Sequence, residues 1–150
     1  MTRLRLPLAI LVVVVLGVAV AGIGQGSAPA SPKVSAAKDR ASIARVAKGG
    51  KQVLEGEKAF DEEGCAACHT MAAGGYDGKL GPRLDVVTKG DDAKADYENI
   101  VKPRGDIAEG YEAQKNLMPA DYAKRIGKTE LKAISAYIAV AAGTKKATGG

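Results

Sequence analysis

The sequence is poor in aromatic residues and in the residue types that build disulfide or zinc frameworks. Its 150 residues include five tyrosines, one phenylalanine, no tryptophan, one histidine and two cysteines. So few aromatic side chains give a small domain little core material, which indicates that something else fills part of the core. Two cysteines and one histidine exclude a disulfide-rich scaffold, and a zinc site would have to borrow carboxylates. The length excludes a large multidomain enzyme.

The formal net charge of +5 is concentrated at the two ends of the chain. Residues 51–142 contain 13 basic and 16 acidic residues, a net charge of −3, so the positive excess lies in residues 1–50 and 143–150. A nucleic-acid-binding domain would carry a basic patch of its own. We therefore expect no nucleic acid among the partners.

An uncharged apolar run extends from Leu6 to Ile23, and Arg3 and Arg5 precede it. The run reaches the lower length limit of a membrane-spanning helix, and it also has the charged, apolar and small-residue regions of a cleavable secretory signal. Residues 1–23 are therefore expected to be a signal peptide or a transmembrane anchor. Both interpretations place the rest of the chain outside the cytoplasm.

The remaining chain divides into a linker, one domain and a tail. Residues 24–50 are expected to form a flexible basic linker, because glycine, serine and proline dominate its first part and its apolar stripe is thin. The alternative for residues 34–48 is a short helix that lies on an acidic surface or on lipid head groups. Residues 51–142 are expected to form the domain, and residues 143–150 a disordered tail.

Helical periodicity dominates the domain. It predicts one helix over residues 51–62, a second after the capping residues Asp91 and Asp92, and a third with Thr129 as N-cap and Gly143 as C-terminal stop. The glycine-rich segment between the first two helices is expected to be a loop. The segment between the last two is expected to be mostly irregular, with a short helix over residues 107–115. No segment shows a convincing strand pattern, so the domain is expected to be all-α with long loops.

Both cysteines and the only histidine lie in five consecutive residues, Cys65-Ala66-Ala67-Cys68-His69. On a helical turn, cysteines three apart face one side, and the next imidazole can reach the same space. This C-x-x-C-H spacing is the signature of covalent c-type haem attachment. The alternatives are a disulfide, which leaves the histidine unexplained, a thioredoxin-like pair, which lacks a βαβ pattern around it, and zinc, which lacks a fourth ligand.

Beyond this motif, the sequence resembles the class I cytochromes c over about residues 51–142. Gly56 and Phe60 resemble the glycine and aromatic residue of the family's N-terminal helix, although Phe60 stands five residues before the first cysteine, where many members have four. Ile134 and Tyr137 resemble the positions of the C-terminal helix that pack across this pair. The resemblance implies a cytochrome c fold of three to five helices, with long loops wrapped around one covalently bound haem.

Two further segments resemble the ligand loops of this family. Gly81-Pro82-Arg83-Leu84 resembles its G-P-x-L segment, whose proline carbonyl orients the axial histidine, and Met118-Pro119 resembles its axial methionine and the proline that follows. Met71 lies two residues after His69 and cannot reach the opposite face of a haem, so Met118 is the methionine available. The alternative for Met118 is a plain core methionine.

The resemblance implies one haem c as the cofactor, with the iron bound by one histidine and one methionine. The implied cofactor-binding residues are Cys65, Cys68, His69, Pro82 and Met118, of which His69 and Met118 are the iron ligands.

The implied function is that of a one-electron carrier, and not an enzyme, in an extracytoplasmic respiratory or related electron-transfer chain. The protein would work in the periplasm or on the outer face of the cytoplasmic membrane, as a membrane-anchored or exported bacterial form. Its expected partners are redox proteins, including membrane electron-transfer complexes, and the membrane itself through residues 6–23, with no small-molecule substrate. The alternatives are a cytochrome subunit of a larger membrane oxidase or dehydrogenase complex, a haem peroxidase and a ligand sensor.

Overall fold

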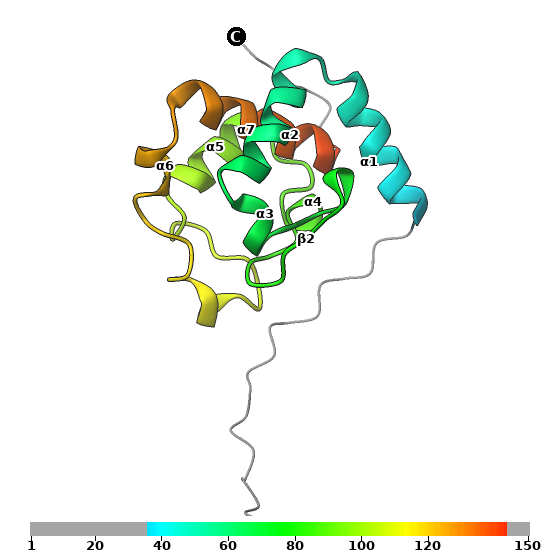
Figure 1. Cartoon of the computed structure of the whole chain (residues 1–150). Helices are drawn as coiled ribbons and strands as arrows, with labels where there is room; N and C mark the ends of the chain where they lie inside the picture. Colours follow the sequence, from blue (N-terminus) through cyan, green and yellow to red (C-terminus); the bar gives the residue numbers. More distant parts are fainter. Residues whose placement is uncertain (1–35, 144–150) are drawn as a thin grey trace, which may run out of the picture.

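The computed structural model describes residues 36–143, so the membrane segment expected at residues 6–23 and nearly all of the expected tail lie outside the described residues. No helix between residues 36 and 143 is both long and apolar enough to cross a membrane. Helices dominate this part of the chain (Figure 1). They are α1 (Ala36–Lys48), α2 (Lys51–Glu62), α3 (Cys65–Cys68), α4 (Leu84–Val87), α5 (Ala93–Val101), α6 (Tyr122–Arg125) and α7 (Lys128–Ala142).

The expected loop between α3 and α4 contains a small antiparallel ribbon. Its strands are β1 (Thr70–Met71) and β2 (Tyr76–Asp77), and the 3-10 turn η1 (Ala72–Gly74) connects them. Gly75 completes this turn with a φ of 69°, a left-handed conformation that favours glycine. The all-α prediction contained no strand, so the ribbon departs from it, but each strand is only two residues long and the predominance of helices is confirmed.

The segment between α5 and α7 was expected to be mostly irregular, with a short helix over residues 107–115. It contains the 3-10 turn η2 (Glu112–Gln114), which is shorter than that helix, and α6. The rest of the segment is turns and bends.

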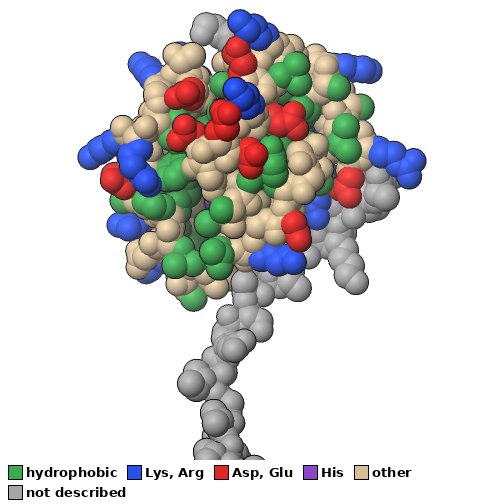
Figure 2. Space-filling model, viewed as in Figure 1, with side chains coloured by type: hydrophobic (Ala, Val, Ile, Leu, Met, Phe, Trp, Pro, Cys, Tyr) green, Lys and Arg blue, Asp and Glu red, His purple; other side chains and the backbone are tan. Residues whose placement is uncertain are grey.

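Charged side chains of both signs are scattered over the face shown in Figure 2, and hydrophobic side chains gather on its lower left. Two ion pairs lie along α2, Lys51–Glu55 at 3.5 Å and Lys58–Glu62 at 3.4 Å. Both pairs are exposed to solvent, and exposed pairs contribute little to stability. The stability of the fold therefore depends mainly on its core.

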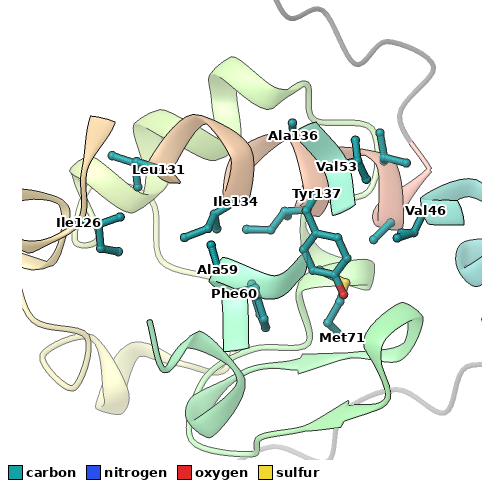
Figure 3. Close-up of a cluster of buried hydrophobic side chains, with 13 residues drawn as sticks. Val46, Val53, Ala59, Phe60, Met71, Ile126, Leu131, Ile134, Ala136 and Tyr137 are labelled. Carbon is teal, nitrogen blue, oxygen red and sulfur yellow. The ribbon is translucent and has the colours of Figure 1, made fainter. Parts of the chain in front are cut away.

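The core is organised around α7, whose residues 133–142 are all buried. Helices α1, α2, α4 and α5 pack against it. Figure 3 shows the Tyr137 side chain extending from α7 toward Phe60 and Met71. The rings of Phe60 and Tyr137 meet edge to face with centroids 5.5 Å apart, a contact worth about 0.5–1.5 kcal/mol beyond the area it buries. This cluster also confirms the expected packing between the N-terminal and C-terminal helices of the domain.

Helices α2 and α7 approach each other closely at Gly56. A Cβ atom on this residue would lie 1.9 Å from the carbonyl oxygen of Ala133 and 2.9 Å from the Cβ of Tyr137. Both distances are shorter than van der Waals contact, so only glycine allows the observed separation of the two helices.

The start of α5 follows from its N-cap residue. The Asp92 carboxylate accepts hydrogen bonds from the backbone N–H groups of Lys94 and Ala95, at 3.0 and 2.9 Å. These groups have no partner inside the helix, so a capping side chain stabilises this end. The prediction of an aspartate cap here is confirmed.

The start of α7 differs from the prediction. Gly127, and not Thr129, is the N-cap, because the Glu130 carboxylate reaches back and accepts a hydrogen bond from the Gly127 N–H at 3.2 Å. The helix therefore begins one residue before Thr129. Its end was predicted correctly, since Gly143 caps it with a φ of 101°, a conformation that favours glycine.

The expected linker over residues 24–50 is wrong for residues 36–48, which form α1. This helix packs against α7 and η1. Only Ser42 and Val46 of its described side chains are buried, each with 3% exposure. Such a narrow buried face explains why the apolar pattern of the sequence did not reveal a packed helix.

Arg45 attaches α1 to the end of α7. Its Nε donates a hydrogen bond to the Val140 carbonyl at 3.0 Å, and its Nη2 donates one to the Ala141 carbonyl at 2.7 Å. These carbonyls lie in the last turn of α7, at the negative end of the helix dipole, where a cation is favourable. These two hydrogen bonds therefore attach α1 to the central helix α7.

Replacing Arg45 with alanine is expected to lower the free energy of unfolding by about 2 kcal/mol, because hydrogen bonds from a charged donor are lost. Urea denaturation of the full chain measures this change. Arg40→Ala is the matched control, since Arg40 is exposed on the same helix, and it should change stability by no more than about 0.5 kcal/mol. Equal losses for the two variants would show that Arg45 does not hold α1 in place.

Candidate functional site

The C-x-x-C-H motif forms a single turn directly after α2. Gly64 connects the two with a φ of 81°, and α3 then carries both cysteines. His69 leaves the turn in an extended conformation, while its backbone N–H still donates to the Cys65 carbonyl at 3.0 Å. The turn thus brings the two thiols and the imidazole to the same side of the backbone.

A cavity of about 220 Å³ lies beside this turn, and all five predicted site residues line it: Cys65, Cys68, His69, Pro82 and Met118. Its wall is mostly apolar, with Leu80, Leu84, Val87, Ile107 and Leu117. A smaller cavity of about 80 Å³ adjoins it and shares Cys65, His69 and Met118 among its lining residues. The fold therefore brings together residues that are up to 53 positions apart in the sequence.

The Pro82 carbonyl holds the imidazole of His69 in place. The His69 Nδ1 lies 3.0 Å from the Pro82 oxygen. Because a carbonyl can only accept, Nδ1 carries the proton and donates it, which leaves a lone pair on Nε2. Burial lowers the pKa of His69, and the bond to Pro82 opposes this effect only in part. A neutral imidazole with an oriented second nitrogen is the form that binds a metal.

Gly81 lets the loop approach the imidazole at close range. A Cβ atom on Gly81 would lie 2.5 Å from Cε1 and 2.7 Å from Nδ1 of His69. The Gly81 N–H also donates to the Cys68 carbonyl at 2.8 Å, which ties the loop to the C-x-x-C-H turn. The resemblance to the G-P-x-L segment thus agrees with the geometry at both Gly81 and Pro82.

The two thiols are free, and the surroundings of Cys65 do not favour its thiolate form. Burial raises the pKa of the Cys65 thiol to about 11. Reactive redox cysteines have lowered pKa values, so this environment argues against a thioredoxin-like pair. Zinc also finds no support, because no group of three or more His, Cys, Asp or Glu side chains within residues 36–143 is arranged to hold a metal ion.

The two methionines of the described chain have different environments. Met71 is fully buried in the core, beside Tyr137 (Figure 3), whereas Met118 lines the cavity. Met118 is therefore the methionine whose sulfur can face a group that also meets His69. This placement agrees with the sequence argument that set Met71 aside.

Several polar residues of the cavity were missed in the sequence: Thr88, Asn99 and Gln114, together with Asp96 in the smaller cavity. Asn99 and Asp96 lie on α5, where polar residues are ordinarily expected on a solvent face, so no sequence signal marked them. Tyr111 and Tyr122 also line the larger cavity. The side-chain oxygen of Gln114 is buried without a hydrogen-bond partner. Such an unpaired polar atom is expected where a bound ligand would complete the cavity.

These residues fit a haem. Two thiols at the spacing of the attachment motif, an imidazole with a free Nε2 and a thioether line one apolar cavity, and a buried polar oxygen in its wall lacks a partner. A c-type haem is attached through two cysteine thiols in this motif, and its iron is commonly bound by a histidine nitrogen and a methionine sulfur.

Comparison with known proteins agrees with this site. The family model described as "Cytochrome c" matches residues 53–141, which is more than half of the chain. The comparisons with curated proteins and with solved structures found no match. Domains of this family are typically extracytoplasmic and typically carry electrons instead of catalysing reactions. With its C-x-x-C pattern at Cys65 and Cys68 consistent with covalent haem c, the chain belongs to the cytochrome c family, and its domain is that of a haem electron carrier.

Proposed function

We propose that the protein is a one-electron carrier with a single haem c bonded to Cys65 and Cys68, and with His69 and Met118 as the iron ligands. The observation that carries this proposal is the shared cavity, which has His69 and Met118 in its wall and the His69 Nδ1 engaged by Pro82. When bound, the haem supplies an Fe(II)/Fe(III) couple. A thioether as second ligand favours the reduced state relative to a second histidine.

The residues around the cavity limit how much changes during electron transfer. The Pro82 carbonyl keeps the Nδ1 proton of His69 in place, so the imidazole neither rotates nor changes tautomer. The tie between Gly81 and Cys68 fixes this loop relative to the attachment turn. If His69 and Met118 both bound the iron, they would leave no position on it for a substrate, which would suit a carrier and not a peroxidase or ligand sensor.

Redox partners are proposed to dock around the mouth of the larger cavity. Leu80, Val87 and Leu117 line this cavity and are also exposed, by 56%, 46% and 59%. Exposed apolar groups at such a mouth suit the small, transient interfaces of electron-transfer proteins. Because residues 51–142 carry a net charge of −3, we propose a partner with a basic docking patch, which charge would steer to the site. The proposed setting is an extracytoplasmic respiratory or related chain.

The ligand assignment is tested by a matched pair of variants, Met118→Leu and Met71→Leu. Both replace a methionine with a side chain of similar volume, which costs about 1.5 kcal/mol or less in a packed site. In the haem-loaded full chain, Met118→Leu is expected to abolish the near-infrared sulfur-to-iron band of the oxidised protein, and Met71→Leu to retain it. Visible and near-infrared absorption spectra measure the result.

The opposite outcomes are equally informative. A native protein that is high-spin and binds cyanide or carbon monoxide at once would have an open iron, which would overturn the carrier and favour a peroxidase or sensor. Loss of the band in Met71→Leu alone would overturn the assignment of Met118.

A further inference from the structure

Asp96 is a buried carboxylic acid that the proposed electron carrier does not use. It lies in the first turn of α5 and is 2% exposed. Neither of its carboxyl oxygens has a hydrogen-bond partner. An unpartnered polar side chain at such depth is costly, so its presence requires an explanation.

The surroundings of Asp96 are apolar and belong to the haem cavity. It lines the smaller cavity together with Phe60, Ile100, Ile126, Ile134 and Ile138. The same cavity includes His69 and Met118, the two proposed iron ligands. A charge that changes at the iron would therefore act on Asp96 through the protein interior, where water screens it poorly.

Within residues 36–143, no lysine or arginine lines the smaller cavity with Asp96. Helix α6 also packs against α5, but its Lys124 and Arg125 are exposed and lie outside this cavity, and Arg125 lies over the Tyr122 ring. On the N-terminal side of α5, Asp91 and Asp92 contribute negative charge. Of the residues of α7, only Ile134 and Ile138 line the smaller cavity. The charged residues Lys128, Glu130 and Lys132 of this helix are exposed. The other titratable groups in the cavity wall are Cys65, His69 and Tyr122.

This environment favours the protonated form of the acid. Burial, together with the negative charges of Asp91 and Asp92, raises the pKa of Asp96 to about 8. The group is therefore poised near neutral pH, where a modest change in nearby charge decides whether it holds a proton.

We propose that Asp96 binds a proton when the haem in this cavity is reduced and releases the proton when the haem is oxidised. This inference rests on the proposed function. Reduction brings one electron to Fe(III) from an electrode or a reduced redox protein, and the Asp96 carboxylate takes one proton from water to become a carboxylic acid. Oxidation returns one electron to the acceptor and one proton to the solvent. Because each transfer moves one negative and one positive charge together, the cavity keeps its net charge.

The midpoint potential of the haem-loaded full chain tests this coupling. An added electron raises the pKa of Asp96, so the potential is expected to fall as the pH rises between the pKa of the oxidised protein and that of the reduced protein. It should be constant below and above this window. A tenfold difference in proton affinity between the two states corresponds to a total fall of about 59 mV. Asp96→Asn should remove this fall, while Glu98→Gln, at an exposed acid of the same helix that lines neither cavity, should preserve it.

A second measurement, made first on the native protein, detects the bound proton directly. The reduced-minus-oxidised infrared difference spectrum of the native protein, recorded inside the window, should contain the band of a newly protonated carboxyl group, and Asp96→Asn should lack it. A potential that is independent of pH, or a fall that persists in Asp96→Asn, would overturn the proposal while leaving the electron carrier intact. By contrast, failure of the electron carrier itself would appear as the absence of a reversible one-electron couple.

Discussion

Alanine in place of Gly56 is expected to lower the free energy of unfolding of the haem-loaded protein by about 2 kcal/mol or more. The added Cβ would lie 1.9 Å from the Ala133 carbonyl oxygen, and this oxygen belongs to the backbone of a buried helix that cannot turn aside. Forced overpacking typically costs about 1–3 kcal/mol or more, and the helix propensity that alanine gains returns only about 1 kcal/mol. Urea denaturation monitored by circular dichroism measures the loss.

Gly105→Ala is the matched control for Gly56→Ala. Gly105 lies in a turn after α5, and a Cβ there would have its closest contacts at 3.2 and 3.6 Å, both with Lys102. Its stability should stay within about 1 kcal/mol of the native protein. If Gly56→Ala were as stable as this control, α2 and α7 would not cross as closely as the structure shows.

Alanine in place of Gly81 is expected to displace the His69 imidazole and convert the spectrum from low-spin to high-spin. Its Cβ would occupy a position 2.5 Å from Cε1 and 2.7 Å from Nδ1 of His69. The ring must then move away from Pro82 and lose the hydrogen bond that orients it. Haem attachment through Cys65 and Cys68 should survive, because this substitution does not alter the thiols. Visible spectra of the purified variant measure the spin state.

Added imidazole separates displacement of the ligand from general unfolding. In Gly81→Ala, free imidazole should bind at the vacated axial position and restore a low-spin spectrum, while the far-ultraviolet circular dichroism stays close to that of the native protein. A native spectrum without imidazole would contradict the close contact between Gly81 and His69. An unfolded variant with no response to imidazole would show that Gly81 serves the fold and not the ligand.

The parts of the site that the sequence predicts are those with short-range or family-typical signals. Five consecutive residues contain the attachment turn, so a single helical turn places Cys65, Cys68 and His69 together. The position of Pro82 behind His69 depended on the resemblance to a family segment, and the 3.0 Å contact agrees with it. The cap at Asp92 likewise depends only on the next three residues.

The features that sequence reasoning missed depend on contacts between distant segments. Arg45 donates hydrogen bonds to the carbonyls of Val140 and Ala141, which lie 95 and 96 residues further along the chain. No local sequence pattern predicts such a contact. Asp96 occupies a helix position that faces inward only because α7 and the cavity lie on that side. Thr129 is an ordinary capping residue, but the reach of Glu130 to Gly127 starts the helix earlier.

The docking of α1 also affects how mechanical force enters the domain. A pull on the chain N-terminal to α1 would reach α1 before α2, and it would be resisted by the two hydrogen bonds of Arg45 to α7 and by the buried Val46. The ion pair between Asp39 and Arg83, at 3.4 Å, gives α1 a second point of attachment. A force applied to the chain before α1 would have to break these contacts before it reached α2 and the cysteines that follow it.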